Sequence, residues 1–171
     1  MQVVKQNALT IEEQIYKCSY IGNIDLLQQI DFGFLCSSKC PGNLIIKIQE
    51  LAFRWREQGF VIASGFHSPV EKEVLNVLIN GPQPIVICPA RSLNNMRLPK
   101  LWRSGLNENR IVIITPIHGS NNRPTKELCN KRNEFLVKLT KKVYIPFVDA
   151  SGKMVKLYNK LKDEDKLIFD I

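Results

Sequence analysis

Small hydroxyl residues, a glycine and cations follow several strand-like runs of this sequence, where turns would lead into helices. Hydroxyls and backbone N–H groups donate hydrogen bonds to phosphate oxygens, and cations balance their charge. The turns therefore predict a site for a phosphate or another anion. The candidate residues in them are Ser37, Ser38, Lys39, Ser64, Gly65, His67, Ser68, Arg91 and Thr115.

His67 and Glu71 allow two interpretations. They could act as a general acid and base, or His67 could bind a ligand through a hydrogen bond. Alternatively, Glu71 closes a capping box on Ser68 at the start of a helix, with Pro69 at the first helical position. The second interpretation makes the pair structural.

A third candidate region is residues 96–103, which places three cations around Trp102. Arg97 and its neighbours suit phosphate contact combined with base stacking, although Trp102 could equally anchor a core. The distribution of charge agrees with an anionic partner. The net charge is +8, yet residues 1–85 hold 7 Lys and Arg against 8 Asp and Glu, whereas residues 86–171 hold 17 against 8. Such asymmetry suggests nucleic acid or a nucleotide phosphate, although solvated lysine-rich helices give the same count.

Several function classes have no support in the sequence. The dinucleotide fingerprint GxGxxG and the phosphate loop GxxxxGK[ST] are absent, and the five cysteines include no zinc-type CxxC pair. We therefore expect no cofactor and no metal. No apolar segment approaches the roughly 20 residues that cross a bilayer, so we expect a cytoplasmic protein that does not enter the membrane.

Strands and helices alternate along most of the chain. Short apolar runs predict strands within residues 31–36, 60–63, 83–89, 110–115 and 142–148, with a last edge strand at 167–169. Helical spacing predicts helices at 44–58, 68–80 and 125–140, while 151–165 is either loop or exposed helix. A capping-box spacing from Thr10 to Glu13 predicts a further helix within residues 1–22.

Continuously apolar strands are buried on both faces, and repeated strand–helix units give parallel sheets. We therefore predict an α/β fold, a Rossmann-like open parallel sheet between helix layers. A single domain should span residues 1–171, with residues 151–171 as a peripheral tail. Ligands of such sheets bind at the carboxyl ends of the strands, where the candidate turns would meet.

Four segments in this order resemble the DprA/Smf family of DNA-processing proteins. They are residues 34–39, the Ser64-Gly65 turn with Val70-Glu71 behind it, the strand at 85–88, and Arg132-Asn133 ahead of a strand. The resemblance extends over residues 22–152. Some positions depart from the family pattern: Cys36 replaces a glycine, Ser38 an arginine, Pro69 a glycine and Glu71 an aspartate.

The resemblance implies a function. Family members bind single-stranded DNA and help to load the RecA recombinase during DNA uptake, and they are not known as catalysts. It implies that Ser37, Ser64, Gly65, Arg132 and Asn133 belong to the binding site, with single-stranded DNA or a nucleotide phosphate as ligand. A RecA-type recombinase and a second copy of the chain are possible partners.

Two other functions stay open. The protein could be an enzyme acting on nucleotides or nucleoside monophosphates, like Rossmann-like phosphoribohydrolases, although their Pro-Gly-Gly-x-Gly-Thr motif is absent. It could also be a nucleotide-sensing interaction domain.

Overall fold

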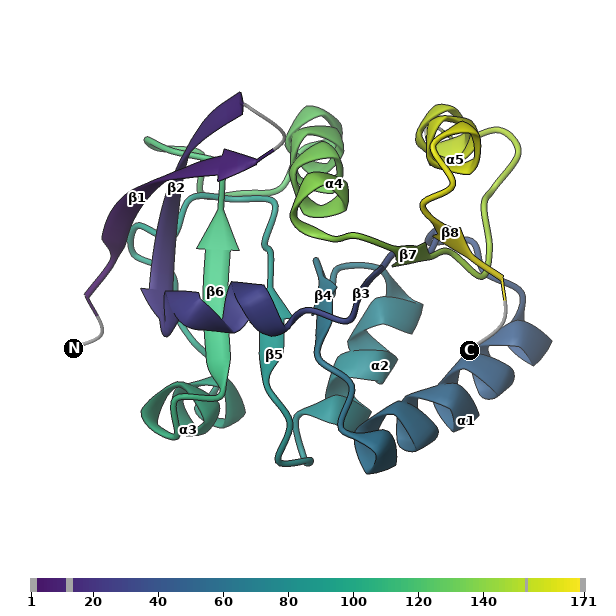
Figure 1. Ribbon diagram of the computed structural model, residues 1–171, viewed down its shortest axis with the longest axis horizontal. Helices are drawn as coiled ribbons and strands as arrows, with labels where there is room; N and C mark the ends of the chain where they lie inside the picture. Colours follow the sequence, from purple (N-terminus) through teal and green to yellow (C-terminus); the bar gives the residue numbers. More distant parts are fainter. Residues whose placement is uncertain (1–2, 12–13, 153, 170–171) are drawn as a thin grey trace.

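The part of the chain that the structure describes is built around an eight-stranded sheet, shown in Figure 1. The computed structural model describes residues 3–11, 14–152 and 154–169. The strand order is β1-β2-β6-β5-β4-β3-β7-β8. The six strands β6, β5, β4, β3, β7 and β8 run parallel to one another. Strands β1 and β2 form an antiparallel hairpin, and β2 pairs antiparallel with β6. The strands are β1 (Lys5–Ile11), β2 (Gln14–Gly22), β3 (Phe32–Phe34), β4 (Ile62–Ser64), β5 (Ile85–Ile87), β6 (Ile111–Thr115), β7 (Val143–Tyr144) and β8 (Leu167–Ile168).

Helices cover both faces of the sheet, and each has its own hydrophobic core. Successive strand residues point to opposite faces, so Ile85 and Ile87 pack with α1, α2 and α3, whereas Val86 packs with α4 and α5. In Figure 1, α1 and α2 lie below the strands and α4 and α5 lie above them. The helices are η1 (Ile24–Gln29), α1 (Gly42–Gln58), α2 (Pro69–Leu78), α3 (Lys100–Asn107), α4 (Lys126–Leu139) and α5 (Met154–Asp163). The predicted α/β sheet between helix layers is confirmed, with an antiparallel hairpin added at one edge.

Local signals placed most of the helices and strands. Helix α1 ends at Gly59, whose φ of 75° is the left-handed cap expected of glycine. Helix α2 begins with the capping box of Ser68 and Glu71 and with Pro69 in its first turn. The edge strand predicted at 167–169 is β8, and the segment left open at 151–165 contains α5.

The helix predicted within residues 1–22 is wrong, because residues 5–11 and 14–22 are the two strands of the β1–β2 hairpin. The helical spacing relied on Ile15, whose side chain is 73% exposed and packs in no core. Apolar residues also recur at every second position, as in a strand with one buried face. Tyr16, Cys18 and Tyr20 follow this spacing along β2, and all three pack into the core beneath α4. Glu12 and Glu13 of the supposed capping box lie outside the described residues.

Across the described residues, no helix combines the length and the apolar character needed to span a bilayer.

Candidate nucleic-acid interface

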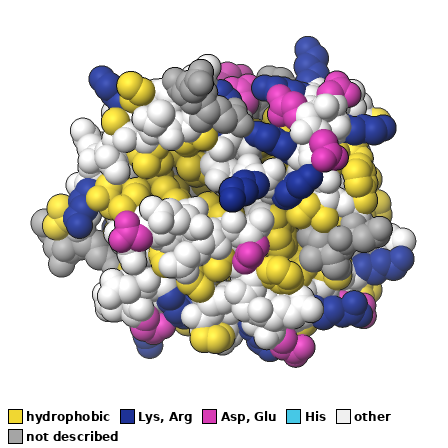
Figure 2. Space-filling view, viewed as in Figure 1, with side chains coloured by type: hydrophobic (Ala, Val, Ile, Leu, Met, Phe, Trp, Pro, Cys, Tyr) yellow, Lys and Arg dark blue, Asp and Glu magenta, His cyan; other side chains and the backbone are white. Residues whose placement is uncertain are grey.

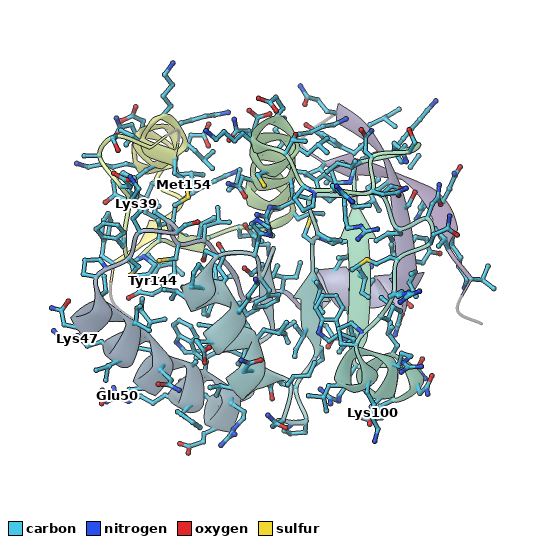
Figure 3. All side chains as sticks on the ribbon, turned by 180° about the vertical axis from the view of Figure 1, so that it is seen from behind. Lys39, Lys47, Glu50, Lys100, Tyr144 and Met154 are labelled. Atoms are coloured by element: carbon cyan, nitrogen blue, oxygen red, sulfur yellow. The ribbon has the colours of Figure 1, made fainter. Side chains whose placement is uncertain are left out.

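A cavity of about 630 Å³ lies at the carboxyl ends of β3 and β4, and we call it the strand-end cavity. The turns after these strands form one side. The start of α4, together with Asp149, Ser151, Gly152 and Met154, forms the other. In Figure 3, Lys39 of the first turn lies beside Met154 at the start of α5. Eight of the thirteen predicted site residues line this cavity: Ser37, Ser38, Lys39, His67, Ser68, Glu71, Arg132 and Asn133.

Glu71 occupies the backbone amides that the two turns present. Its side chain is buried, and one carboxylate oxygen accepts a hydrogen bond from the Cys36 amide at 3.1 Å. The other oxygen accepts from the amides of His67 at 2.8 Å and Ser68 at 3.2 Å. These three amides are therefore not free to bind a ligand. The Glu71 carboxylate therefore joins the two turns, which favours the structural interpretation of this residue.

Most of the predicted hydroxyls hold the turns together. Ser64 and Thr115 are fully buried, and their hydroxyl oxygens accept hydrogen bonds from the amides of Phe66 and Ile117. The Ser37 hydroxyl accepts from the amide of Asp149 at 3.0 Å. Ser38, by contrast, is exposed on the cavity rim, so its hydroxyl can reach a ligand.

Arg132 enters the cavity from α4 and is 3% exposed. Its Nη1 donates a hydrogen bond to the Cys88 carbonyl at 3.2 Å. Its Nε is buried without a partner, and no carboxylate of the described residues forms an ion pair with the guanidinium. Asn133, which follows Arg132 and also lines the cavity, has a buried Oδ1 without a partner.

Gly65 makes room for this guanidinium. A Cβ atom at Gly65 would lie 0.7 Å from Nη1 of Arg132, so any side chain there would displace the arginine. The residue is not among the glycines with positive φ, so its role is to leave space rather than to permit a turn. The Ser64-Gly65 and Arg132-Asn133 segments of the sequence are thus the two sides of one contact.

The charge around the cavity is positive. Lys39, Lys126 and Arg132 face Glu71 and Asp149, and Lys39 forms an exposed ion pair with Asp149 at 3.6 Å. Because Glu71 is already surrounded by backbone donors, its charge is largely compensated. Figure 2 shows further Lys and Arg side chains over the half of the molecule that carries α4, β7 and α5 in Figure 1.

His67 favours its neutral form. Its pKa lies below the ordinary value of 6.5, because partial burial disfavours the imidazolium and the positive charge of Arg132 adds to the effect. Burial also raises the pKa of the Cys36 thiol, so this thiol does not supply a nucleophilic thiolate. Among the residues that the structure describes, no three His, Cys, Asp or Glu side chains gather as metal ligands would.

Five predicted residues do not line the strand-end cavity. Ser64 and Thr115 are buried in turns, and Gly65 lies behind Arg132. Arg91 donates to the Ser92 carbonyl at 3.2 Å, and Arg97 lines a different cavity. The turns were expected to bring these side chains together, but the five lie in different surroundings outside the strand-end cavity.

The sequence-based prediction missed the wall opposite the turns. Lys126 and Thr125 at the start of α4 line the cavity, as do Asp149 and Gly152. A signal was present for α4, since Thr125 caps the helix by accepting from the Leu128 amide at 3.2 Å. Nothing in the sequence indicated that residues 149–152 would fold back onto the turn at Ser37.

Solved structures of other proteins have the same architecture. A structure of DNA processing protein A from Helicobacter pylori, described for its single-stranded DNA binding mode, superposes with a TM-score of 0.75 at 16% identity. The match covers 100% of this chain and 82% of that one. The chain has the fold of DNA processing protein A. DprA from Streptococcus pneumoniae matches with a TM-score of 0.69 at 16% identity, over 91% of this chain and 56% of its own, so this chain spans about half of it.

Neither a protein-family model nor a curated protein matches the sequence. The similarity to DprA that the comparisons show is therefore one of fold.

Proposed function

We propose that the protein binds single-stranded nucleic acid, and that a phosphate of the strand lies in the strand-end cavity. The observation that carries this proposal is the buried guanidinium of Arg132, which has no carboxylate partner among the described residues. A buried charge without a counter-charge is costly, and an incoming phosphate would supply the missing charge. Lys39 and Lys126 at the rim add to the attraction.

The neighbouring side chains suit a nucleotide. A neutral His67 can stack on a base or exchange hydrogen bonds with it, and Ser38 on the rim can donate to a phosphate oxygen. The H. pylori protein of the same fold is described as binding single-stranded DNA, which agrees with this ligand. Binding rather than catalysis is the proposed activity, because the Glu71 carboxylate is occupied by three amides.

By analogy with DprA, we also propose a role in DNA uptake or recombination inside the cell. A RecA-type recombinase would be the protein partner, and the working form would be a homodimer. A strand-exchange assay with and without the protein, together with sedimentation of the free protein, tests these two points. Unchanged strand exchange or a monomer at all concentrations would contradict them.

The binding proposal is tested by the salt dependence of oligothymidylate affinity, measured by fluorescence anisotropy. Log affinity should fall with log salt by about 0.7 per phosphate contacted, so the double variant Lys39→Gln with Lys126→Gln should have a slope shallower by about 1.4. The control variant, Lys47→Gln with Lys100→Gln, removes the same charge from α1 and α3, away from the cavity in Figure 3. It should keep the wild-type slope. Absence of binding at micromolar protein, or equal slopes for all three proteins, would contradict the proposal.

The protonation of His67 gives a second test. A phosphate in the cavity would stabilise the imidazolium, so NMR titration should show a pKa below 6.5 in the free protein and a higher pKa in the complex. By linkage, affinity should rise as pH falls through the window below 6.5. The free protein should instead lose stability there, because its folded state disfavours the charged ring. A His67 pKa that does not change at saturating oligonucleotide would place the phosphate elsewhere.

A further inference from the structure

A second cavity, of about 750 Å³, lies between α4 and α5. We call it the α4–α5 groove. It is lined by Glu134, Val137 and Lys138 of α4 and by Lys156, Leu157 and Lys160 of α5. It shares Asn130, Asn133, Ser151, Gly152 and Met154 with the strand-end cavity. Because five residues line both, the two cavities form one continuous depression that leads away from Arg132.

The groove is positively charged on its α5 side. Lys156 and Lys160 are exposed and lie four residues apart, so they project from the same face of the helix. Lys160 is within 3.7 Å of Glu164, but both side chains are largely in solvent and such a pair contributes little. Glu134 is the one carboxylate among the described residues that line the groove. The net charge of the lining is therefore positive even without Lys138, which bonds to Tyr16 and Gln14.

Apart from Asn130 and Asn133, the rest of the lining is apolar or small. Val137 is buried, Met154 and Leu157 are half-buried, and Ser151 and Gly152 form the passage to the strand-end cavity. An apolar wall with cations along one edge fits a strand that places bases and sugars against the wall and phosphates against the cations. The ten residues of α5 extend over about 15 Å, which is long enough for several nucleotides.

We propose that the α4–α5 groove holds the nucleotides that follow the one in the strand-end cavity, with Lys156 and Lys160 contacting successive phosphates. This inference rests on the proposed function, because it extends the path of the same strand. A polymeric ligand is favoured over a single nucleotide, because the depression continues well beyond Arg132. In addition, the two lysines follow one another along α5 as successive phosphates follow one another along a strand.

The test compares binding of oligothymidylates of about 2 to 16 nucleotides to the wild type and to the double variant Lys156→Gln with Lys160→Gln. For the longest oligomers, the variant should lose about tenfold in affinity at low salt, and its salt slope should be shallower by about 1.4. The dinucleotide fills only the strand-end cavity, so the affinity of the variant for it should stay within about twofold of the wild-type affinity. The control variant, Lys47→Gln with Lys100→Gln, should match the wild type at every length.

The outcomes separate this inference from the proposed function. If the groove variant and the control have equal slopes, or if short and long oligomers lose affinity equally, the strand does not follow the groove, although it still binds at Arg132. If no oligomer binds the wild type, both proposals fail. Tighter binding of a polyglutamate peptide than of an oligomer with equal charge would assign the groove to an acidic protein segment and overturn the inference.

Discussion

Replacing Gly65 by alanine should lower the free energy of unfolding by about 3 kcal/mol and abolish oligonucleotide binding. The added methyl would lie 0.7 Å from Nη1 of Arg132, so the guanidinium must leave its place and its hydrogen bond to the Cys88 carbonyl. A displaced guanidinium remains a charge in a buried region, which makes the effect large. Urea unfolding and anisotropy with an oligothymidylate measure the two effects.

Two controls isolate the cause of this loss. Gly42→Ala in the first turn of α1 introduces a methyl that meets nothing within 4 Å, and it should be neutral or stabilise by up to about 1 kcal/mol. The second control is Gly65→Ala in an Arg132→Ala background, where the clashing group is absent. There the glycine substitution should cost less than about 1 kcal/mol, because effects of residues in contact are not additive. A full penalty in that background would show that Gly65 serves the backbone and not Arg132.

The fold could be predicted where local chemistry determines it. The Ser68 and Glu71 spacing placed the start of α2, the left-handed cap at Gly59 placed the end of α1, and apolar runs placed the parallel strands. The hairpin was missed because its β2 strand carries apolar residues at both helical and alternating spacing. Its antiparallel pairings with β1 and β6 decide between the two, and the pairing with β6 joins residues far apart in the sequence.

The candidate site could be predicted only in part. Sequence reasoning located the turns at the carboxyl ends of the strands, but it could not show which of their polar groups would be occupied. Glu71 caps α2 as expected, yet it also reaches the Cys36 amide of a neighbouring turn. Contacts of this kind depend on how two strand–helix units pack against each other. The residue types within either unit do not indicate that packing.

The same limit applies to the basic residues. Arg91 and Arg97 follow β5 in sequence and seemed equivalent to Lys39, but only Lys39 lines the strand-end cavity. Lys126 was not singled out, because a lysine in the first turn of a helix is an ordinary solvated residue. The geometry therefore changes the expected effects of substitution on oligonucleotide affinity. Arg97→Gln should leave this affinity within about twofold of the wild type, whereas substitution of Arg132 should lower it most.

Substituting Arg132 by methionine should separate stability from binding. The side chain is buried and forms no ion pair with a carboxylate of the described residues, so an apolar chain of similar length removes a buried charge without breaking an ion pair. The Cys88 carbonyl loses its donor, which offsets part of that gain, and the free energy of unfolding should change by less than about 1.5 kcal/mol. Oligonucleotide affinity should fall about 100-fold, since the charge that attracts the phosphate is gone.

Arg132→Lys, which keeps a charge but not the planar fork, should bind with intermediate affinity. If Arg132→Met unfolds the protein, or if it binds as tightly as the wild type, the buried guanidinium is a structural group and not the phosphate site.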